Sequence, residues 1–194
     1  MTDAAAALRT GKPVILPTDT VYGLCAAADE PGPTEALYRL KGRDPAQPSA
    51  LLAADLDTLL EWLPELHGRE ERIARALLPG AYTLILPNPA RRYPWLTGLN
   101  ADAIGVRVAP LPDAAAKVLA EIGAVVATSA NRPGEPEPRR IEDVPPEFRD
   151  AVGAVVDAGE LPGRSSTVID FTGPEPRVLR EGAGSVAAAL SALA

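Results

Sequence analysis

The segment PVILPTDTVYGLCAAA, residues 13–28, sets the expected architecture of this chain. Its first part, PVILP (13–17), is a short apolar run between two prolines, and VYGLCAAA (21–28) is a second apolar run. Both have the length and composition of buried strands. Only a short polar turn separates them, and neighbouring strands linked by short turns favour a mixed sheet. A purely parallel sheet is therefore not expected.

Strand-like and helix-like segments alternate along the rest of the chain. Short apolar runs that favour strands lie at 49–54, 81–87, 103–109, 124–131, 154–159, 166–171 and 177–181. Amphipathic or alanine-rich patterns that favour helices lie near the N-terminus and at 33–40, 56–63, 68–78, 113–123, 142–150 and 185–193. We predict one α/β domain over residues 1–194, with a mixed sheet and flanking helices.

Composition excludes several classes of protein. With 46% hydrophobic residues in 194, a folded core is expected, and a formal net charge of -7 argues against a surface that grips nucleic acid through phosphate contacts. The single cysteine, Cys25, and the single histidine, His67, exclude an intramolecular disulfide and argue against a zinc site or a Cys–His catalytic pair. Acidic Asp3 does not suit a signal peptide, and no apolar run approaches a membrane span. A cytoplasmic location is expected.

Polar side chains cluster where the predicted strands end, which is where α/β sheets bind ligands. The usual nucleotide-binding fingerprints are absent from the sequence. The polar groups are Thr18 to Tyr22, Lys41 and Arg43, Arg107, Ser129 and Asn131, Ser165 to Thr167, and Arg180.

Each polar group also has a purely structural interpretation. The threonines of TDT suit a turn that bonds its own backbone, and the cations of KGR suit the C-terminal end of a helix dipole. SAN suits a turn or cap, and an arginine within a strand suits an edge that faces water. Taken together, however, Lys41, Arg43, Arg107 and Arg180 could neutralise a triphosphate and a carboxylate. The set therefore favours a site for a substrate with several negative charges.

The motifs LPTDTVYGL, KGRDP, PGAYTLILP, WLTGL, IGVRV, TSAN, SSTVID and VLREG follow one another over nearly the whole chain. In this order they resemble the YrdC/Sua5 family of L-threonylcarbamoyladenylate synthases, in its short YrdC form. The resemblance implies a YrdC-like (DHBP synthase-like) fold, with a twisted mixed sheet, flanking helices and a large central cavity. It also implies a nucleotidyltransferase that converts L-threonine, bicarbonate and ATP into threonylcarbamoyl-AMP and pyrophosphate, for N6-threonylcarbamoyladenosine in tRNA.

The resemblance assigns roles residue by residue. It implies catalytic roles for Lys41 and Arg43, L-threonine contacts for Thr20, Arg107 and Ser166, and nucleotide contacts for Arg43, Gln47, Ser129, Asn131 and Arg180. It implies Mg²⁺ carried with ATP, no protein metal ligand, and a product passed to a tRNA threonylcarbamoyl transferase complex. The chemistry needs no protein nucleophile, because a carbamate made from the threonine amine and bicarbonate can itself attack the α-phosphate.

Two other functions stay open at this point. One is a related carbamoyl-adenylate activity, as in the YrdC-like module of hydrogenase-maturation proteins. The other is a double-stranded RNA-binding or ribosome-assembly protein of the YrdC family without this activity, since a basic cavity mouth could still bind tRNA or RNA weakly.

The chain departs from the family pattern at several places. Gln47 and Leu52 stand where many Sua5 relatives have asparagine and histidine, and Ala103 replaces a hydroxyl residue. The loop after SAN reads RPGEPEPRR, so Glu135 and Glu137 fall near the expected triphosphate. We expect Arg139 or Arg140 in the same loop to compensate for these carboxylates.

Overall fold

The computed structural model describes residues 1–193 and places their strands in one nine-stranded sheet of order β7-β1-β2-β6-β3-β5-β4-β8-β9. The strands are β1 Val14–Pro17, β2 Tyr22–Ala27, β3 Ala50–Ala53, β4 Tyr82–Pro87, β5 Ala103–Val108, β6 Ala124–Ser129, β7 Ala154–Val155, β8 Thr167–Asp170 and β9 Arg177–Arg180. The helices are α1 Asp3–Arg9, α2 Pro31–Lys41, α3 Leu56–Trp62, α4 Arg69–Leu77, α5 Asp113–Ile122, α6 Pro146–Ala151 and α7 Val186–Ala192, with a 3₁₀ turn at Ile141–Asp143.

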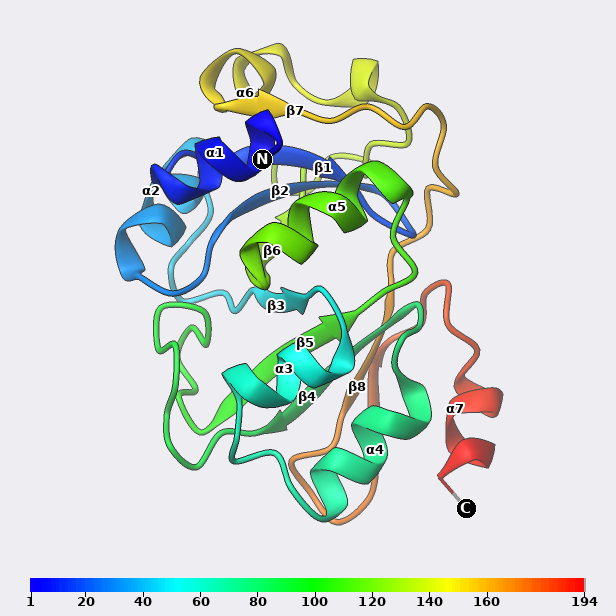
Figure 1. The fold of residues 1–194 in the computed structure, drawn as a ribbon. Coiled ribbons are helices and arrows are strands. Elements are labelled where there is room, and N and C mark those ends of the chain that lie inside the picture. Colours follow the sequence, from blue (N-terminus) through cyan, green and yellow to red (C-terminus); the bar gives the residue numbers. More distant parts are fainter. Residues whose placement is uncertain (194) are drawn as a thin grey trace.

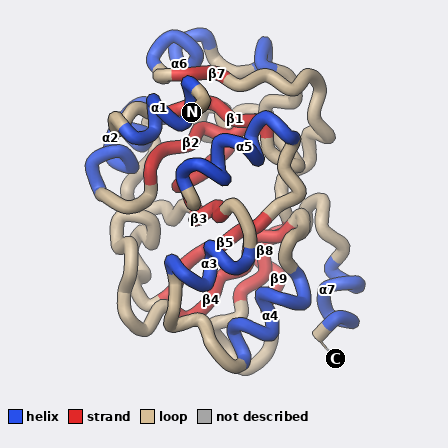
Figure 2. The backbone as a smooth tube through the Cα atoms, viewed as in Figure 1, coloured by secondary structure: helices blue, strands red, loops and turns tan. Residues whose placement is uncertain are grey.

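The mixed sheet and the flanking helices confirm the predicted fold class. β1 and β2 pair antiparallel, from Val14 opposite Cys25 to Pro17 opposite Tyr22. β3 and β5 pair parallel, as do β4 and β8, and β7 pairs parallel with β1. Figure 2 shows the strands in red, from β7 at the top of the view to β9 beside β8 in the lower half.

Two predicted elements were wrong in extent. The helix expected over 142–150 is split into the 3₁₀ turn and α6, because Val144 precedes a proline and is extended, with φ -72° and ψ 129°. The strand expected over 154–159 stops at Val155. Beyond it, Asp157 and the carbonyl of Gly159 accept hydrogen bonds from the Tyr22 hydroxyl, at 2.6 and 2.8 Å, so this segment turns away from β1.

The two faces of the sheet are covered unequally. One face carries the larger core, in which Leu59 of α3, Ile73 of α4 and Phe148 of α6 pack among strand residues. The other face carries a smaller core, in which α1 and α5 cover part of the sheet. In Figure 1, α1 and α5 lie beside β1 and β2 in the upper half of the view, and α3 and α4 lie beside β4 and β5 in the lower half. Part of the second face is therefore left without a helix.

Within residues 1–193, no helix combines the length and the apolar character that crossing a membrane requires.

Candidate functional site

The uncovered part of the second sheet face forms the floor of a cavity of about 470 Å³. Side chains alternate along a strand, so residues two apart share a face. On this face the floor positions are small: Gly23 of β2, Ala50 of β3, Gly105 of β5 and Ala127 of β6 all line the cavity. Because so little side-chain volume stands on the floor, space remains above the sheet for a ligand.

The TDT turn after β1 forms one wall of the cavity. The Thr18 hydroxyl accepts hydrogen bonds from the backbone N–H groups of Thr20 and Val21, both at 3.2 Å, and donates to the Val21 carbonyl at 2.7 Å. Thr18 thus closes the turn, as its structural interpretation predicts. The Thr20 hydroxyl shares a 3.0 Å hydrogen bond with that of Thr18, and both residues line the cavity.

The KGR motif lies where α2 ends. Gly42 has a φ of 66°, the left-handed conformation that glycine adopts without strain, and it terminates the helix. The reversal carries Arg43 into the cavity wall, where its guanidinium lies 5.9 Å from the centre of the Tyr38 ring and donates to the Thr128 hydroxyl at 3.4 Å. The Nε of Arg43 is buried without a partner.

Lys41 lies behind the cavity wall and is only 5% exposed. Its ammonium group donates to the backbone carbonyl of Ser129, and lies 3.4 Å from both the Ser129 hydroxyl and the Asn131 amide oxygen. Burial, with a smaller contribution from Arg43, lowers the pKa of Lys41 to about 8, while Glu137 opposes the shift. Ser129 lines the cavity, whereas Lys41 and Asn131 support it from behind.

Arg107 of β5 is buried in the cavity wall rather than exposed at an edge. Its guanidinium donates to Asp19 at 2.7 Å, and the two side chains are 10% and 6% exposed. Burial lowers the pKa of Arg107 and raises that of Asp19, and each partner opposes the shift of the other. The Nε of Arg107 and the second carboxylate oxygen of Asp19 have no partner. Arg107 lines the cavity and bonds Asp19 through one terminal nitrogen, so its other terminal nitrogen can donate to a ligand.

Ser166 and Arg180 meet on the far side of the cavity. The Arg180 guanidinium donates to the Ser166 carbonyl at 3.2 and 2.9 Å, and the Ser166 hydroxyl shares a 2.8 Å hydrogen bond with Thr83 of β4. These three residues line the cavity together with Thr20 and Arg43. The structure thus gathers polar groups from widely separated parts of the chain around one space.

Gln47 is exposed and does not line the cavity, although its neighbour Pro48 does. Leu52, the other departure on this stretch, is buried under α1 and α5 in the smaller core, also outside the cavity. Ala103 does line it.

The carboxylates of the loop after β6 behave differently from one another. Glu137 lines the cavity, whereas Glu135 is exposed and pairs with Arg132 at 3.1 Å. The expectation that Arg139 or Arg140 compensates for them was wrong, because both arginines pair with Glu160. Glu160 lies on the segment after β7, and neither arginine lines the cavity.

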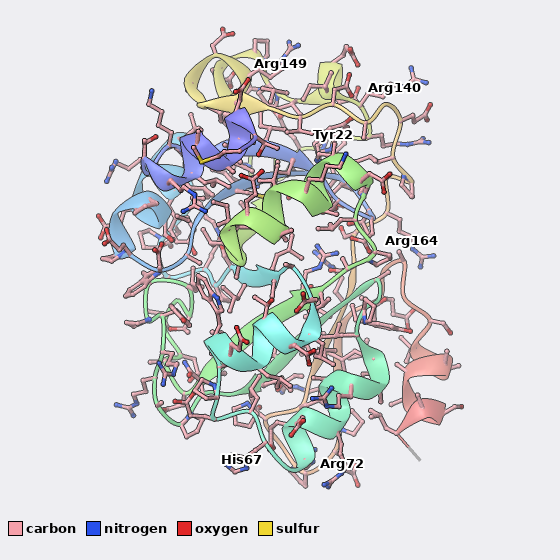
Figure 3. The ribbon with its side chains drawn as sticks, viewed as in Figure 1. Tyr22, His67, Arg72, Arg140, Arg149 and Arg164 are labelled. Atoms are coloured by element: carbon pink, nitrogen blue, oxygen red, sulfur yellow. The ribbon has the colours of Figure 1, made fainter. Side chains whose placement is uncertain are left out.

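Cys25 and His67 have no place in the site. Cys25 is fully buried in the smaller core, and burial raises the pKa of its thiol to about 12. His67 is exposed at the opposite end of the view from Tyr22 in Figure 3. Among residues 1–193, no three histidine, cysteine or acidic side chains gather in a metal-binding arrangement.

Several lining or supporting residues escaped the sequence analysis. Asp19 sits inside the TDT motif, but only the fold shows that it pairs with Arg107. Thr83 is a polar residue among apolar neighbours in β4, and strict alternation along that strand could have identified it. A further polar group, Asp170, Thr172 and Arg177, lines the end of the cavity near β9, with Arg177 donating to Asp170 at 2.9 Å.

A mixed α/β sheet with a cavity lined by arginine and hydroxyl groups is an arrangement suited to small anionic ligands. The chain belongs to the Sua5/YciO/YrdC family: the family model described as "Telomere recombination" matches residues 6–182.

Named relatives support this membership over most of the chain. A threonylcarbamoyl-AMP synthase of Chromohalobacter salexigens is 35% identical over 173 residues, which cover 89% of this chain and 93% of that protein. The crystal structure of Pyrococcus abyssi Sua5 complexed with L-threonine is 32% identical, with a TM-score of 0.76 over 92% of this chain. This chain spans 53% of that Sua5 chain. Escherichia coli YciO is 27% identical, with a TM-score of 0.77 over 95% of this chain and 90% of that one.

Proposed function

We propose that this protein is an L-threonylcarbamoyladenylate synthase, a nucleotidyltransferase that makes threonylcarbamoyl-AMP and pyrophosphate from L-threonine, bicarbonate and ATP. The observation that carries the proposal is that Arg43, Arg107 and Arg180 line one cavity together with the hydroxyl groups of Thr20 and Ser166. The names of the relatives point to the same reaction, and one structural relative is a complex with L-threonine.

The threonine subsite would lie at Arg107. An α-carboxylate is an anion that a guanidinium binds well, and Arg107 lines the cavity while only one of its terminal nitrogens bonds Asp19 within the described residues. Asp19 neutralises part of the charge and fixes the orientation of the guanidinium. Thr20 and Ser166 would orient the amine and the side-chain hydroxyl of the substrate.

The nucleotide would extend from this subsite towards Arg43 and Ser129. Arg43 supplies a cation in the wall, and Lys41 bonds the Ser129 backbone carbonyl from behind, with the Asn131 amide oxygen also 3.4 Å from its ammonium group. Arg180 and the exposed Gln47 would make further nucleotide contacts. Arg180 lines the cavity, whereas Gln47 lies outside it. Lys41 would act through its charge and through the position of Ser129.

The reaction balances without a protein nucleophile. The threonine amine loses a proton and attacks the carbon of bicarbonate, and loss of water leaves a carbamate. A carbamate oxygen then attacks the α-phosphorus of ATP, and the bond to the β-phosphate oxygen breaks to release pyrophosphate. Arg43 and Lys41 would stabilise the negative charge that develops on the phosphate, so catalysis would rest on positioning and electrostatics.

We also propose that Mg²⁺ arrives with ATP, held mainly by the phosphate oxygens, which neutralise such an ion well. The product would be consumed by a tRNA threonylcarbamoyl transferase complex. The alternative of an RNA-binding protein without this activity is not favoured, because the named relatives are synthases and the net charge of the chain is -7.

The test is pyrophosphate release from ATP by the purified protein, with and without bicarbonate and L-threonine. We expect release that requires both, with a strong preference for threonine over serine. Arg107→Ala should raise the KM for threonine far more than the KM for ATP, whereas Arg72→Ala, on an exposed position of α4, should change neither. Release that is indifferent to threonine would reject the proposal.

A further inference from the structure

Glu137 is a carboxylate inside a cavity whose other charged walls are largely cationic. It lies in the loop after β6, and the loop is anchored on both sides of it. The Asn131 amide donates to the Glu135 carbonyl at 2.6 Å, and the Tyr22 backbone N–H donates to the Pro138 carbonyl at 3.0 Å. The backbone therefore presents Glu137 to the cavity instead of leaving it on a free loop.

The Glu137 carboxylate accepts a hydrogen bond from the Ser165 hydroxyl, which also lines the cavity. Within the described residues, Glu137 forms no direct ion pair, although Arg43 lines the same cavity. Its charge is close enough to Lys41 to counter part of the effect of burial on that lysine. Glu137 thus acts on Lys41 through its charge without an ion pair to it, and it lines the same cavity as Arg43.

The neighbouring charges of the loop do not neutralise Glu137. Glu135, two residues earlier, is occupied by Arg132 at 3.1 Å, and Arg139 and Arg140 both pair with Glu160. Among residues 1–193, the hydrogen-bond partner of the carboxylate is a neutral hydroxyl, that of Ser165. A ligand phosphate in the same space would meet a carboxylate that has no direct ion pair among the described residues.

We propose that Glu137 is a specificity-determining residue, a built-in counter-anion that competes with phosphate groups for Lys41 and Arg43 and so weakens the retention of polyphosphate. This inference rests on the proposed function to the extent that the ligand carries phosphates. In the ligand-free protein, Glu137 partly neutralises the cationic wall. A polyphosphate must either turn the carboxylate away or bind beside it against charge repulsion. Release of pyrophosphate is correspondingly faster.

The first experiment measures binding of inorganic pyrophosphate by calorimetry to the full chain and to Glu137→Gln. The amide keeps the size of the side chain and an oxygen that accepts from Ser165, and removes only the charge. We expect the Kd to fall about tenfold, as for loss of one partly screened like-charge interaction, and the difference to shrink at high salt. Glu135→Gln is the matched control, because it makes the same change in the same loop outside the cavity, and its Kd should not change.

The second experiment needs no ligand. The chain has three lysines, at positions 12, 41 and 117, so the side-chain NMR signal of Lys41 can be assigned with Lys12→Arg and Lys117→Arg variants. Glu137→Gln should lower the pKa of Lys41 below its value of about 8, because a neighbouring negative charge favours the ammonium form. Glu135→Gln should leave it unchanged.

Tighter pyrophosphate binding together with the lowered Lys41 pKa supports the inference. Equal or weaker binding by Glu137→Gln, or an unchanged Lys41 pKa, overturns it and leaves the proposed synthase activity standing. If pyrophosphate binds to none of the three proteins at either salt concentration, the cavity does not bind phosphate groups, and the inference is overturned.

Discussion

The same face of the sheet is a packed core at one end and an open cavity at the other. Cys25 of β2, Leu52 of β3 and Val125 of β6 lie beneath α1 and α5 in the smaller core. Gly23 lies two residues before Cys25 in β2, and Ala50 lies two residues before Leu52 in β3. Both are on the same face of the sheet, and both line the cavity. Side-chain volume therefore decides where helices pack and where space for a ligand remains.

The two ends also differ in charge. The covered end is apolar, and its helices stabilise the fold by burying hydrocarbon. The open end carries Arg107, which is buried and paired with Asp19, and a desolvated guanidinium whose Nε has no partner costs free energy. Substitutions at the covered end should thus affect stability, and those at the open end should affect activity.

The largest expected effect is at the open end. Arg43→Ala removes a cavity cation and should lower threonine-dependent pyrophosphate release at least about 100-fold, with little change in the free energy of unfolding. Arg39→Ala removes an exposed arginine from the last turn of α2, four residues before Arg43, and is the control. Steady-state kinetics and urea denaturation measure the two quantities. If Arg43→Ala failed to fold, the open end would also be required for stability, and the proposed difference between the two ends would be wrong.

At the covered end the expectation is reversed. Leu119 of α5 is fully buried, so Leu119→Ala should lower the free energy of unfolding by about 2–5 kcal/mol through lost burial and a new cavity. The turnover of the molecules that remain folded should not change. Lys117→Ala, at an exposed position of the same helix, should have almost no effect on urea denaturation. If Leu119→Ala lowered turnover without changing the free energy of unfolding, the assignment of stability to the covered end would be wrong.

Ionisation of Lys41 should make the free energy of unfolding and the turnover depend on pH. Its pKa in the folded protein is about 8, below the usual lysine value, so between about pH 8 and 10 the unfolded chain binds more protons. The free energy of unfolding should therefore rise with pH in this window, by up to about 3 kcal/mol relative to Lys41→Met. Turnover should fall over the same range as the ammonium charge is lost. Parallel urea-denaturation series for the two proteins measure the first effect, and equal slopes would refute it.

The smallest effect on stability is expected at the cavity floor. A Cβ at Gly105 would meet the Ser49 carbonyl at 3.6 Å and the Thr83 methyl at 3.7 Å, which are ordinary contacts. Gly105→Ala should thus change the free energy of unfolding by less than about 1 kcal/mol. Because it fills part of the floor, it should weaken binding of L-threonine severalfold, as calorimetry can measure. Unchanged threonine binding would place the ligand elsewhere in the cavity.

Much of the fold followed from local patterns. The apolar runs on either side of TDT predicted β1 and β2, and Gly42 after the apolar positions of α2 predicted the helix end that carries Arg43. Predictions failed where a single nearby residue outweighed the pattern. Pro145 interrupted the helix expected over 142–150. Residues 157–159 bond the Tyr22 hydroxyl and do not continue the expected strand.

The candidate site was predictable as a set of residue types and not as an arrangement. Polar groups at strand ends identified Thr20, Arg43, Arg107, Ser129, Ser166 and Arg180, which the fold brings to one cavity. No local pattern could show that Asp19 pairs with Arg107, 88 residues away, or that Lys41 reaches the Ser129 carbonyl. Such pairs depend on which strands become neighbours.

The sequence alone determined the class of fold, the chemistry of its polar motifs and the family to which they belong, because these depend on residue type and local order. The tertiary structure decided which carboxylates and cations share a space. Glu135 and Glu137 are two residues apart in one loop, yet one pairs with Arg132 at the surface and the other lines the cavity. The Asn131–Glu135 bond is local, but the Tyr22 N–H meets the Pro138 carbonyl only once distant parts of the chain have come together, and this contact fixes the loop beside the cavity.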